Sequence, residues 1–255
     1  MSAALAGQVR RRGIALDQPL IVLVLLACWQ GAYAYAGSSA ITSPFATLAY
    51  AVAMLEQGWF WSNVGATALA FFYSLVIASL LGVLAGLGLG LWRFAGDVTE
   101  PVLAALYTIP KVTLYPLILL LFGLGLPAKV AFGVIHGVIP VTLFTLAAVK
   151  GLPPVLLRSA RAMRLSPRQT LLHVLAPAVL PEIFTGLRVG FSLTLLGVLI
   201  GEMFASQKGM GFLILNGINL HNVKLTTAVV LIVVVTAILA NAGLLEADKR
   251  LRRQR

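Results

Sequence analysis

The sequence predicts an all-α protein that crosses a membrane several times, and three observations support this prediction. Only 11% of the 255 residues are charged, whereas 60% are hydrophobic, and the mean hydropathy is +0.97. A soluble domain carries about 25% charged residues, so this chain has too few to cover a surface in water. The apolar residues also gather in stretches of about 20, the length that a helix needs to cross a bilayer core.

Six apolar stretches account for most of the chain. We place them at about residues 19–36, 64–92, 101–123, 127–149, 180–205 and 224–245. The remaining segments are too short for a separate soluble domain, so residues 1–255 are expected to form a single transmembrane domain. The longest connection on the cytoplasmic side is a loop at 150–179, between the fourth and fifth spans.

The first stretch could be a secretory signal, because arginines precede it and it ends in Ala34-Tyr35-Ala36. However, its apolar run is longer than the roughly 7–15 residues of a signal sequence. We therefore expect it to be kept as the first transmembrane helix. After it, Ser43-Pro44 predicts a short outer helix toward Glu56, because serine caps helix starts and proline suits the first helical position.

The basic residues predict the orientation. With a cytoplasmic N-terminus, most of the 19 Lys and Arg residues fall on the cytoplasmic side, as the positive-inside rule requires. These are Arg10, Arg11, Arg12, Arg93, Lys150, Arg158, Arg161, Arg164, Arg168, Lys249, Arg250, Arg252, Arg253 and Arg255. Both termini are then cytoplasmic, and the pI of about 10.4 needs no nucleic acid as a partner.

Glycines repeat at every fourth position in the second span, at Gly82, Gly86 and Gly90. Small residues at this spacing allow two helices to approach closely in lipid. The partner helix could belong to a second copy of the chain, which would make this a dimer seam, or to the same chain. Both interpretations stay open at this point.

The third and fourth spans contain Pro110, Pro116 and Pro140, which are expected to interrupt them. Non-helical backbone persists at membrane depth only when it is packed in protein or lines a wet cavity. Polar side chains at that depth are candidates for function. The predicted translocation path consists of Lys111, Tyr115, His136, Arg188 and Glu202.

Three of the path residues also have a structural interpretation. His136 could bond a neighbouring helix, Arg188 could reach the inner interface, and Glu202 could form an ion pair with a basic residue. Among these residues at membrane depth, Lys111 and Arg188 are cations and Glu202 is the one acid, so their charge balance favours an anionic solute. The residue types predict neither a metal site nor catalytic residues.

The loop at 150–179 is rich in arginine and has signals for two short helices. Pro153-Pro154 suits a helix start. Ser166-Pro167-Arg168-Gln169 forms a capping box for a second helix, which puts a corner at Leu165-Ser166 and an end near Ala176, before Pro177. Such a pair could be an amphipathic hairpin held at the lipid headgroups, or it could be a docking element.

Several stretches resemble one known family. The loop contains Arg158-Ser159-Ala160, then Arg164, then Val174-Leu175-Ala176-Pro177, and other stretches are YTIPKVTLYPLILLLFGLG (107–125), GLRVGF (186–191) and GEMFASQKGMGFLI (201–214). They resemble the permease subunits of binding-protein-dependent ABC importers, in the branch for nitrate, sulfonates and taurine. Ala160, Val174 and Pro177 match the family's loop pattern. Arg158 stands in place of its acidic residue, and Arg164 in place of its glycine.

The resemblance implies a type I ABC importer permease fold in the bacterial plasma membrane. It implies a homodimer, two cytoplasmic ATP-binding subunits and an extracytoplasmic solute-binding protein as partners. The loop would be a coupling helix that docks on the ATPase. Its docking residues would be Arg158, Ser159, Ala160, Arg161, Met163, Arg164, Leu165, Ser166 and Arg168. This chain would bind no cofactor, since ATP and Mg would bind to the partner ATPase.

The sequence agrees with ATP binding by a separate subunit. A P-loop needs a lysine followed by Ser or Thr, and no lysine of this chain is followed by either, so no P-loop is present. Two other functions are weighed against the importer. One is a passive channel or facilitator. The other is an intramembrane serine protease that would use Ser192 with His136 or His221 as its base.

Overall fold

The computed structural model describes residues 20–253, and within this range the chain consists of helices and short connections without a strand. Residues 1–19 and 254–255 lie outside it, including Arg10, Arg11 and Arg12 and the predicted start of the first span at residue 19. The described residues form two compact units, 20–58 with 214–232 and 59–213 with 233–253. The prediction of a single transmembrane domain stays a prediction.

The long helices confirm the membrane class. Among the described residues, four helices are long and apolar enough to cross a membrane, at Gly58–Leu91, Leu126–Lys150, Arg168–Phe204 and Val223–Arg250. A bent pair, Arg93–Thr108 with Lys111–Phe122, makes a fifth if it counts as one span. The apolar helix Leu20–Ala36, where the first span was predicted, is shorter.

The smaller unit contains the predicted outer helix, α2 (Pro44–Leu55). The Ser43 hydroxyl accepts a hydrogen bond from the Ala46 amide, and Pro44 takes the first helical position, so the capping signal is confirmed. Thr42 joins other parts of this unit, because its carbonyl accepts from the Trp29 indole at 2.9 Å and its hydroxyl from Thr227 at 3.2 Å.

The third predicted span, 101–123, is interrupted at Pro110, so this predicted interruption is confirmed. The chain forms α4 (Arg93–Thr108), a 3₁₀ turn η1 (Lys111–Leu114) and α5 (Tyr115–Phe122), with a bend of 87° at the break. Pro110 causes the break, because a residue before proline is pushed out of the helical region, and Ile109 is extended at φ −63 and ψ 131. Pro116 does not interrupt α5, since it lies in its first turn.

The predicted interruption at Pro140 is also wrong, because α6 (Leu126–Lys150) runs through it. This helix lies between two others. A Cβ atom at Gly133 would strike Ser74 of α3 (Gly58–Leu91), and one at Gly137 would strike Thr194 of α9 (Ala176–Ala205). Packing on both sides supports the helix where proline removes one backbone hydrogen bond.

The glycine repeat of α3 packs within the chain. A Cβ atom on Gly82 would lie 2.7 Å from Val141 Cβ, and one on Gly86 would lie 2.5 Å from Thr145 Cβ. Gly90 meets Val149 in the same way, so α3 and α6 approach along three successive turns. The intramolecular interpretation of the repeat is therefore confirmed.

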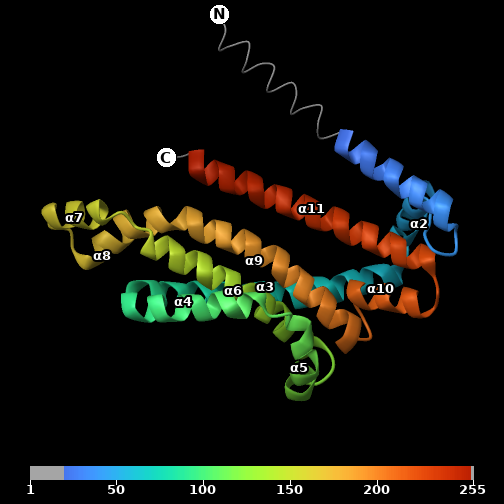
Figure 1. Cartoon of the computed structure of the whole chain (residues 1–255), viewed down its shortest axis with the longest axis horizontal. Helices are drawn as coiled ribbons and strands as arrows, with labels where there is room; N and C mark the ends of the chain where they lie inside the picture. Colours follow the sequence, from blue (N-terminus) through green and yellow to red (C-terminus); the bar gives the residue numbers. More distant parts are fainter. Residues whose placement is uncertain (1–19, 254–255) are drawn as a thin grey trace, which may run out of the picture. The chain divides into compact units, whose positions relative to one another are not determined.

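The predicted end of the second loop helix near Ala176 is wrong. The second loop helix, α8 (Pro167–Thr170), continues through a π-helical turn, η2 (Leu171–Leu175), into α9. The π turn accommodates Pro177, because the Ala176 amide bonds to the Leu171 carbonyl and the register shifts just before the residue that has no amide. α6 and α9 lie side by side, with α7 (Pro154–Ala162) and α8 at one end of the pair (Figure 1).

Candidate functional site

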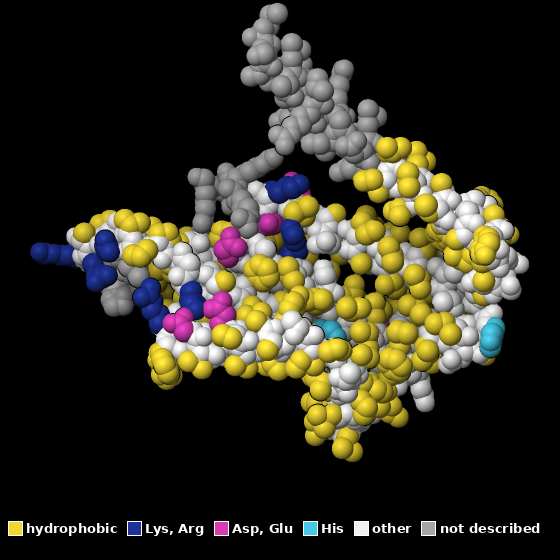
Figure 2. Space-filling view, viewed as in Figure 1, with side chains coloured by type: hydrophobic (Ala, Val, Ile, Leu, Met, Phe, Trp, Pro, Cys, Tyr) yellow, Lys and Arg dark blue, Asp and Glu magenta, His cyan; other side chains and the backbone are white. Residues whose placement is uncertain are grey.

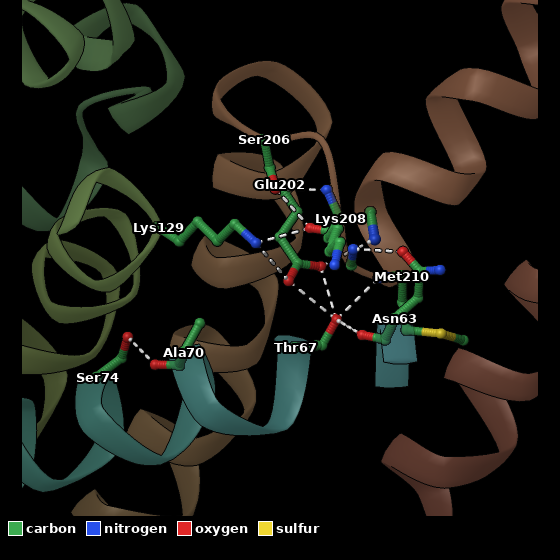
Figure 3. A network of polar contacts seen from close by, with 11 residues as sticks. Asn63, Thr67, Ala70, Ser74, Lys129, Glu202, Ser206, Lys208 and Met210 are labelled. Atoms are coloured by element: carbon green, nitrogen blue, oxygen red, sulfur yellow. Dashed lines mark hydrogen bonds and ion pairs between the residues drawn. The ribbon is translucent and has the colours of Figure 1, made fainter. Parts of the chain in front are cut away.

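Glu202 is the centre of a buried polar network near the C-terminal end of α9 (Figure 3). Its side chain is fully buried. Lys129, in the first turn of α6, places its Nζ 3.6 Å from Glu202 Oε1, and the lysine is itself 5% exposed. The Thr67 hydroxyl of α3 lies 2.9 and 2.8 Å from the two carboxylate oxygens and donates to the carboxylate. The ion pair that the sequence allowed for Glu202 is confirmed.

The same network holds the start of α10 (Met210–Asn219). The Gly209 amide donates to Asn63 Oδ1 at 2.8 Å, and the Met210 amide donates to the Thr67 hydroxyl at 2.8 Å. The Gly211 amide donates to Glu202 Oε2 at 3.0 Å. Three successive amides at a helix start, which lack partners in their own helix, are thus bonded by side chains of α3 and α9.

The Gly-x-Gly sequence of this segment has a steric cause. Gly209 has φ +127, which favours glycine, and a Cβ atom there would strike the Glu202 carboxylate. A Cβ atom on Gly211 would strike the Leu199 carbonyl of α9. Lys129 completes the arrangement, because its Nζ also donates to the Lys208 carbonyl at 2.7 Å. Sequence reasoning missed the roles of Lys129, Thr67 and Asn63, because they lie on α6 and α3, far from Glu202 along the chain.

Tyr115 and His136 come together on one aromatic side chain. The Tyr115 ring lies 5.7 Å from the Phe132 ring and 5.0 Å from the Phe204 ring, centre to centre. The His136 ring stacks on Phe132 at 5.8 Å, and its Nδ1 donates to the Phe132 carbonyl at 2.8 Å. This bond leaves Nε2 of a neutral imidazole as an acceptor.

The other predicted path residues lie apart from this cluster. Lys111 sits at the break between α4 and α5, where its Nζ donates to the Tyr107 carbonyl at 3.1 Å and lies 5.1 Å from the centre of the Tyr107 ring. Arg188 of α9 pairs with Asp248 of α11 (Val223–Arg253) at 3.9 Å. The five residues therefore do not form one constellation, and their role in transport stays a prediction.

The predicted two-helix corner is confirmed in detail. α7 begins at Pro154 and ends in a tight turn, in which the Leu165 amide donates to the Ala160 carbonyl and the Arg164 amide to the Arg161 carbonyl, both at 3.0 Å. This is the Schellman end of a helix, which needs a left-handed residue, usually glycine. Arg164 fills that position with φ 52. Arg164, which the resemblance places at the family's glycine, therefore has a backbone conformation that favours glycine.

The capping box at the start of α8 is confirmed as well. The Gln169 amide donates to the Ser166 hydroxyl at 3.3 Å, and the Ser166 amide donates to Gln169 Oε1 at 2.9 Å. These reciprocal bonds fix the direction of the chain after the turn. The corner is therefore built by local signals at both of its helix ends.

The corner has a buried and an exposed side. Ala160 is 2% exposed and lines a groove with Val174 and Pro177, so the three residues that match the family's loop pattern meet in one place. Leu165, which is half-buried, lines the groove too. Basic side chains gather around this end of the larger unit (Figure 2). The exposed predicted docking residues are Arg158, Ser159, Arg161, Met163, Arg164, Ser166 and Arg168.

An ion cluster lies directly before the corner. Lys150, the last residue of α6, places its Nζ 2.6 Å from both Asp97 Oδ1 and Glu100 Oε2 of α4. It ties the start of the loop to a neighbouring helix.

No hydrogen bond joins Ser192 to a histidine among residues 20–253, so the described structure contains no serine protease dyad at Ser192.

Residues 78–253 match the family described as binding-protein-dependent transport system inner membrane component. The taurine transport system permease protein of Escherichia coli K12 is 27% identical over 191 residues, which cover 75% of this chain and 70% of that protein. The riboflavin transport system permease protein of Chloroflexus aurantiacus is 31% identical and covers 78% and 75%. The nitrate import permease protein of Leptolyngbya laminosa is 27% identical and covers 85% and 79%.

The fold is also similar to a solved structure. An inward-facing conformation of the MetNI methionine ABC transporter aligns with a TM-score of 0.58 and 18% identity, and the alignment covers 75% of this chain and 93% of the matched chain. This likeness confirms the fold predicted from the resemblance.

Proposed function

We propose a function from one premise: the chain belongs to the family of binding-protein-dependent transport system inner membrane components, as the match over residues 78–253 shows. It is a multi-pass membrane permease with relatives of nitrate and taurine type, and it is not itself an enzyme. Within this family, the chain would be the membrane subunit of an ATP-driven importer that works by alternating access. A serine protease is excluded by the family.

The observation that carries the proposal is the two-helix corner of α7 and α8. Both of its helix ends are fixed by local hydrogen bonds, while its arginines are exposed. A membrane anchor would need only the charges, whereas a preformed shape is what a protein partner can bind. We propose that this surface docks on an ATPase subunit, which binds ATP and Mg because this chain has no P-loop.

The assembly would contain two copies of this chain, two cytoplasmic ATP-binding subunits and an extracytoplasmic solute-binding protein. The basic residues support cytoplasmic N- and C-termini, and the corner would then face the ATPase. The Glu202 network would lie toward the opposite side of the membrane, near the binding protein.

We propose a small anionic solute. The names of the taurine and nitrate relatives support this class, although another relative is named for riboflavin. Arg188 and Glu202 are already ion-paired. Lys111, Tyr115 and His136 are therefore the stronger candidates for solute contact, because no ion pair within residues 20–253 engages them.

Two measurements test the proposal. The tagged chain, purified from its native membrane in mild detergent, is expected to bring down a stoichiometric protein with a P-loop. The variant Arg158→Glu/Arg168→Glu should lose that protein, whereas Lys249→Glu, which changes another exposed cytoplasmic charge, should keep it.

Uptake then separates the importer from a passive facilitator. Vesicles that carry the complete transporter should accumulate labelled taurine or nitrate only when ATP is supplied. If the chain purifies alone and uptake continues without ATP, the importer proposal is wrong and the chain is a passive facilitator. The arginines of the corner would then only set the orientation in the membrane.

A further inference from the structure

The start of α10 is unusual because distant side chains take the place of a local helix cap. Among the first amides, those of Gly209, Met210 and Gly211 donate to Asn63, Thr67 and Glu202. Two of these acceptors lie on α3 and one on α9. The carboxylate also lies at the positive end of the helix dipole of α10, which favours a negative charge there.

The carboxylate is locked from the other side by Lys129. Its Nζ lies 3.6 Å from the carboxylate and donates to the Lys208 carbonyl, in the segment that leads into α10. Lys129 thus binds both Glu202 and the segment before α10, whose first turn is bonded to Glu202 through the Gly211 amide. A buried charge pair of this kind persists only when further hydrogen bonds satisfy both members.

Steric contact removes the remaining freedom. Gly209 and Gly211 bring the backbone so close to α9 that neither has room for a Cβ atom. Met210 is 5% exposed, so the first residue of α10 is also packed. The described polar groups of the network are paired with one another, which argues against a solute site here and for an anchor.

We propose that Glu202 is a positioning residue: with Lys129 and Thr67 it clamps the first turn of α10 to α3, α6 and α9. These segments then move as one body during transport. The clamp itself depends only on this chain, whereas its movement during transport rests on the proposed function.

Hydrogen exchange at the backbone amides of residues 209–211 tests the clamp directly. In Glu202→Gln, the exchange of these amides should accelerate by about tenfold or more, because a charge-assisted hydrogen bond and the ion pair are both weakened. Thr67→Val removes one donor to the carboxylate and one acceptor of an amide with little change of shape, so it should accelerate exchange at the same amides.

Asp248→Asn is the matched control, since it removes another buried carboxylate that is paired with a basic residue of α9. It should leave exchange at 209–211 unchanged even if it lowers the thermal midpoint as much as Glu202→Gln does. If Glu202→Gln fails to fold, Thr67→Val carries the test. Exchange at 209–211 that matches the wild type in the folded variants would overturn the clamp.

The assembled transporter tests the common movement. Residues 209–211 should stay equally protected without nucleotide and in a vanadate-trapped state. Loss of protection in the trapped state would overturn the one-body movement. A chain that shows the exchange effects but no ATP-dependent uptake would keep the clamp and lose the proposed function.

Discussion

The Glu202 network and the α7–α8 corner use charge in opposite ways. The network buries one acid and one lysine and surrounds them with hydrogen-bond partners from α3 and from the start of α10. The corner exposes four arginines on two short helices and the turn between them, and local hydrogen bonds close the facing helix ends. The contrast indicates that the charges of the network have their role within the chain, and it agrees with our proposal that the charges of the corner bind a partner.

This comparison predicts the largest loss of stability where one member of the buried pair is removed. Lys129→Met should destabilise the chain by about 3–5 kcal/mol, because Glu202 is left as an uncompensated buried charge. Thermal unfolding in detergent measures the effect. The double variant Lys129→Met/Glu202→Gln should be less damaged than the sum of its single changes, and strict additivity would show that the pair is not coupled.

A smaller loss is expected where packing without charge joins the helices. Gly86→Ala should cost about 1–3 kcal/mol, because the new methyl group would lie 2.5 Å from Thr145 Cβ. Gly88→Ala is the control on the same helix, since nothing lies within 4 Å of a Cβ atom there. Thermal unfolding should give a lower midpoint for Gly86→Ala than for Gly88→Ala. Equal midpoints would show that the close α3–α6 contact at Gly86 does not contribute to stability.

The corner should respond less than either buried site. Ser166→Ala removes one half of the capping box and should cost about 1 kcal/mol. The arginines of the corner are unchanged in this variant, so co-purification of the ATPase should weaken only because α8 frays. A loss of stability as large as that of Lys129→Met would contradict the contrast between the two regions.

The smallest effect has the opposite sign. Arg164→Gly should stabilise the corner by at most about 1 kcal/mol, because it relieves a left-handed non-glycine residue at some cost in chain entropy. The thermal midpoint should rise slightly. If ATPase binding nevertheless falls, Arg164 is retained for its charge at the interface, whereas unchanged binding would assign it no docking role.

Local signals in the sequence predicted the features that depend on neighbouring residues. Ser43, Ser166 and Gln169 cap the helices as expected, and Pro154 starts α7. Pro110 breaks the third span, because its ring constrains the residue directly before it. Arg164, which the resemblance placed at the family's glycine, has the left-handed backbone that favours glycine.

Features that depend on distant residues could not be predicted in the same way. Pro140 and Pro177 resemble Pro110 in sequence, yet α6 continues through one and a π turn accommodates the other. The difference lies in the packing around them, which composition does not reveal. The bend of 87° and the continuity of α8 with α9 are likewise properties of the assembled helices.

By itself, then, the sequence determined the membrane class, the local helix ends and the family resemblance, because hydropathy and capping act over one span or one turn. The tertiary structure decided which partner each buried group has. Lys129 and Glu202 are 73 positions apart, and Thr67 is 135 positions from Glu202. Only the packing of α3, α6 and α9 brings their side chains together. Once these polar groups are buried in a low-dielectric interior, each needs the others as hydrogen-bond or ion-pair partners.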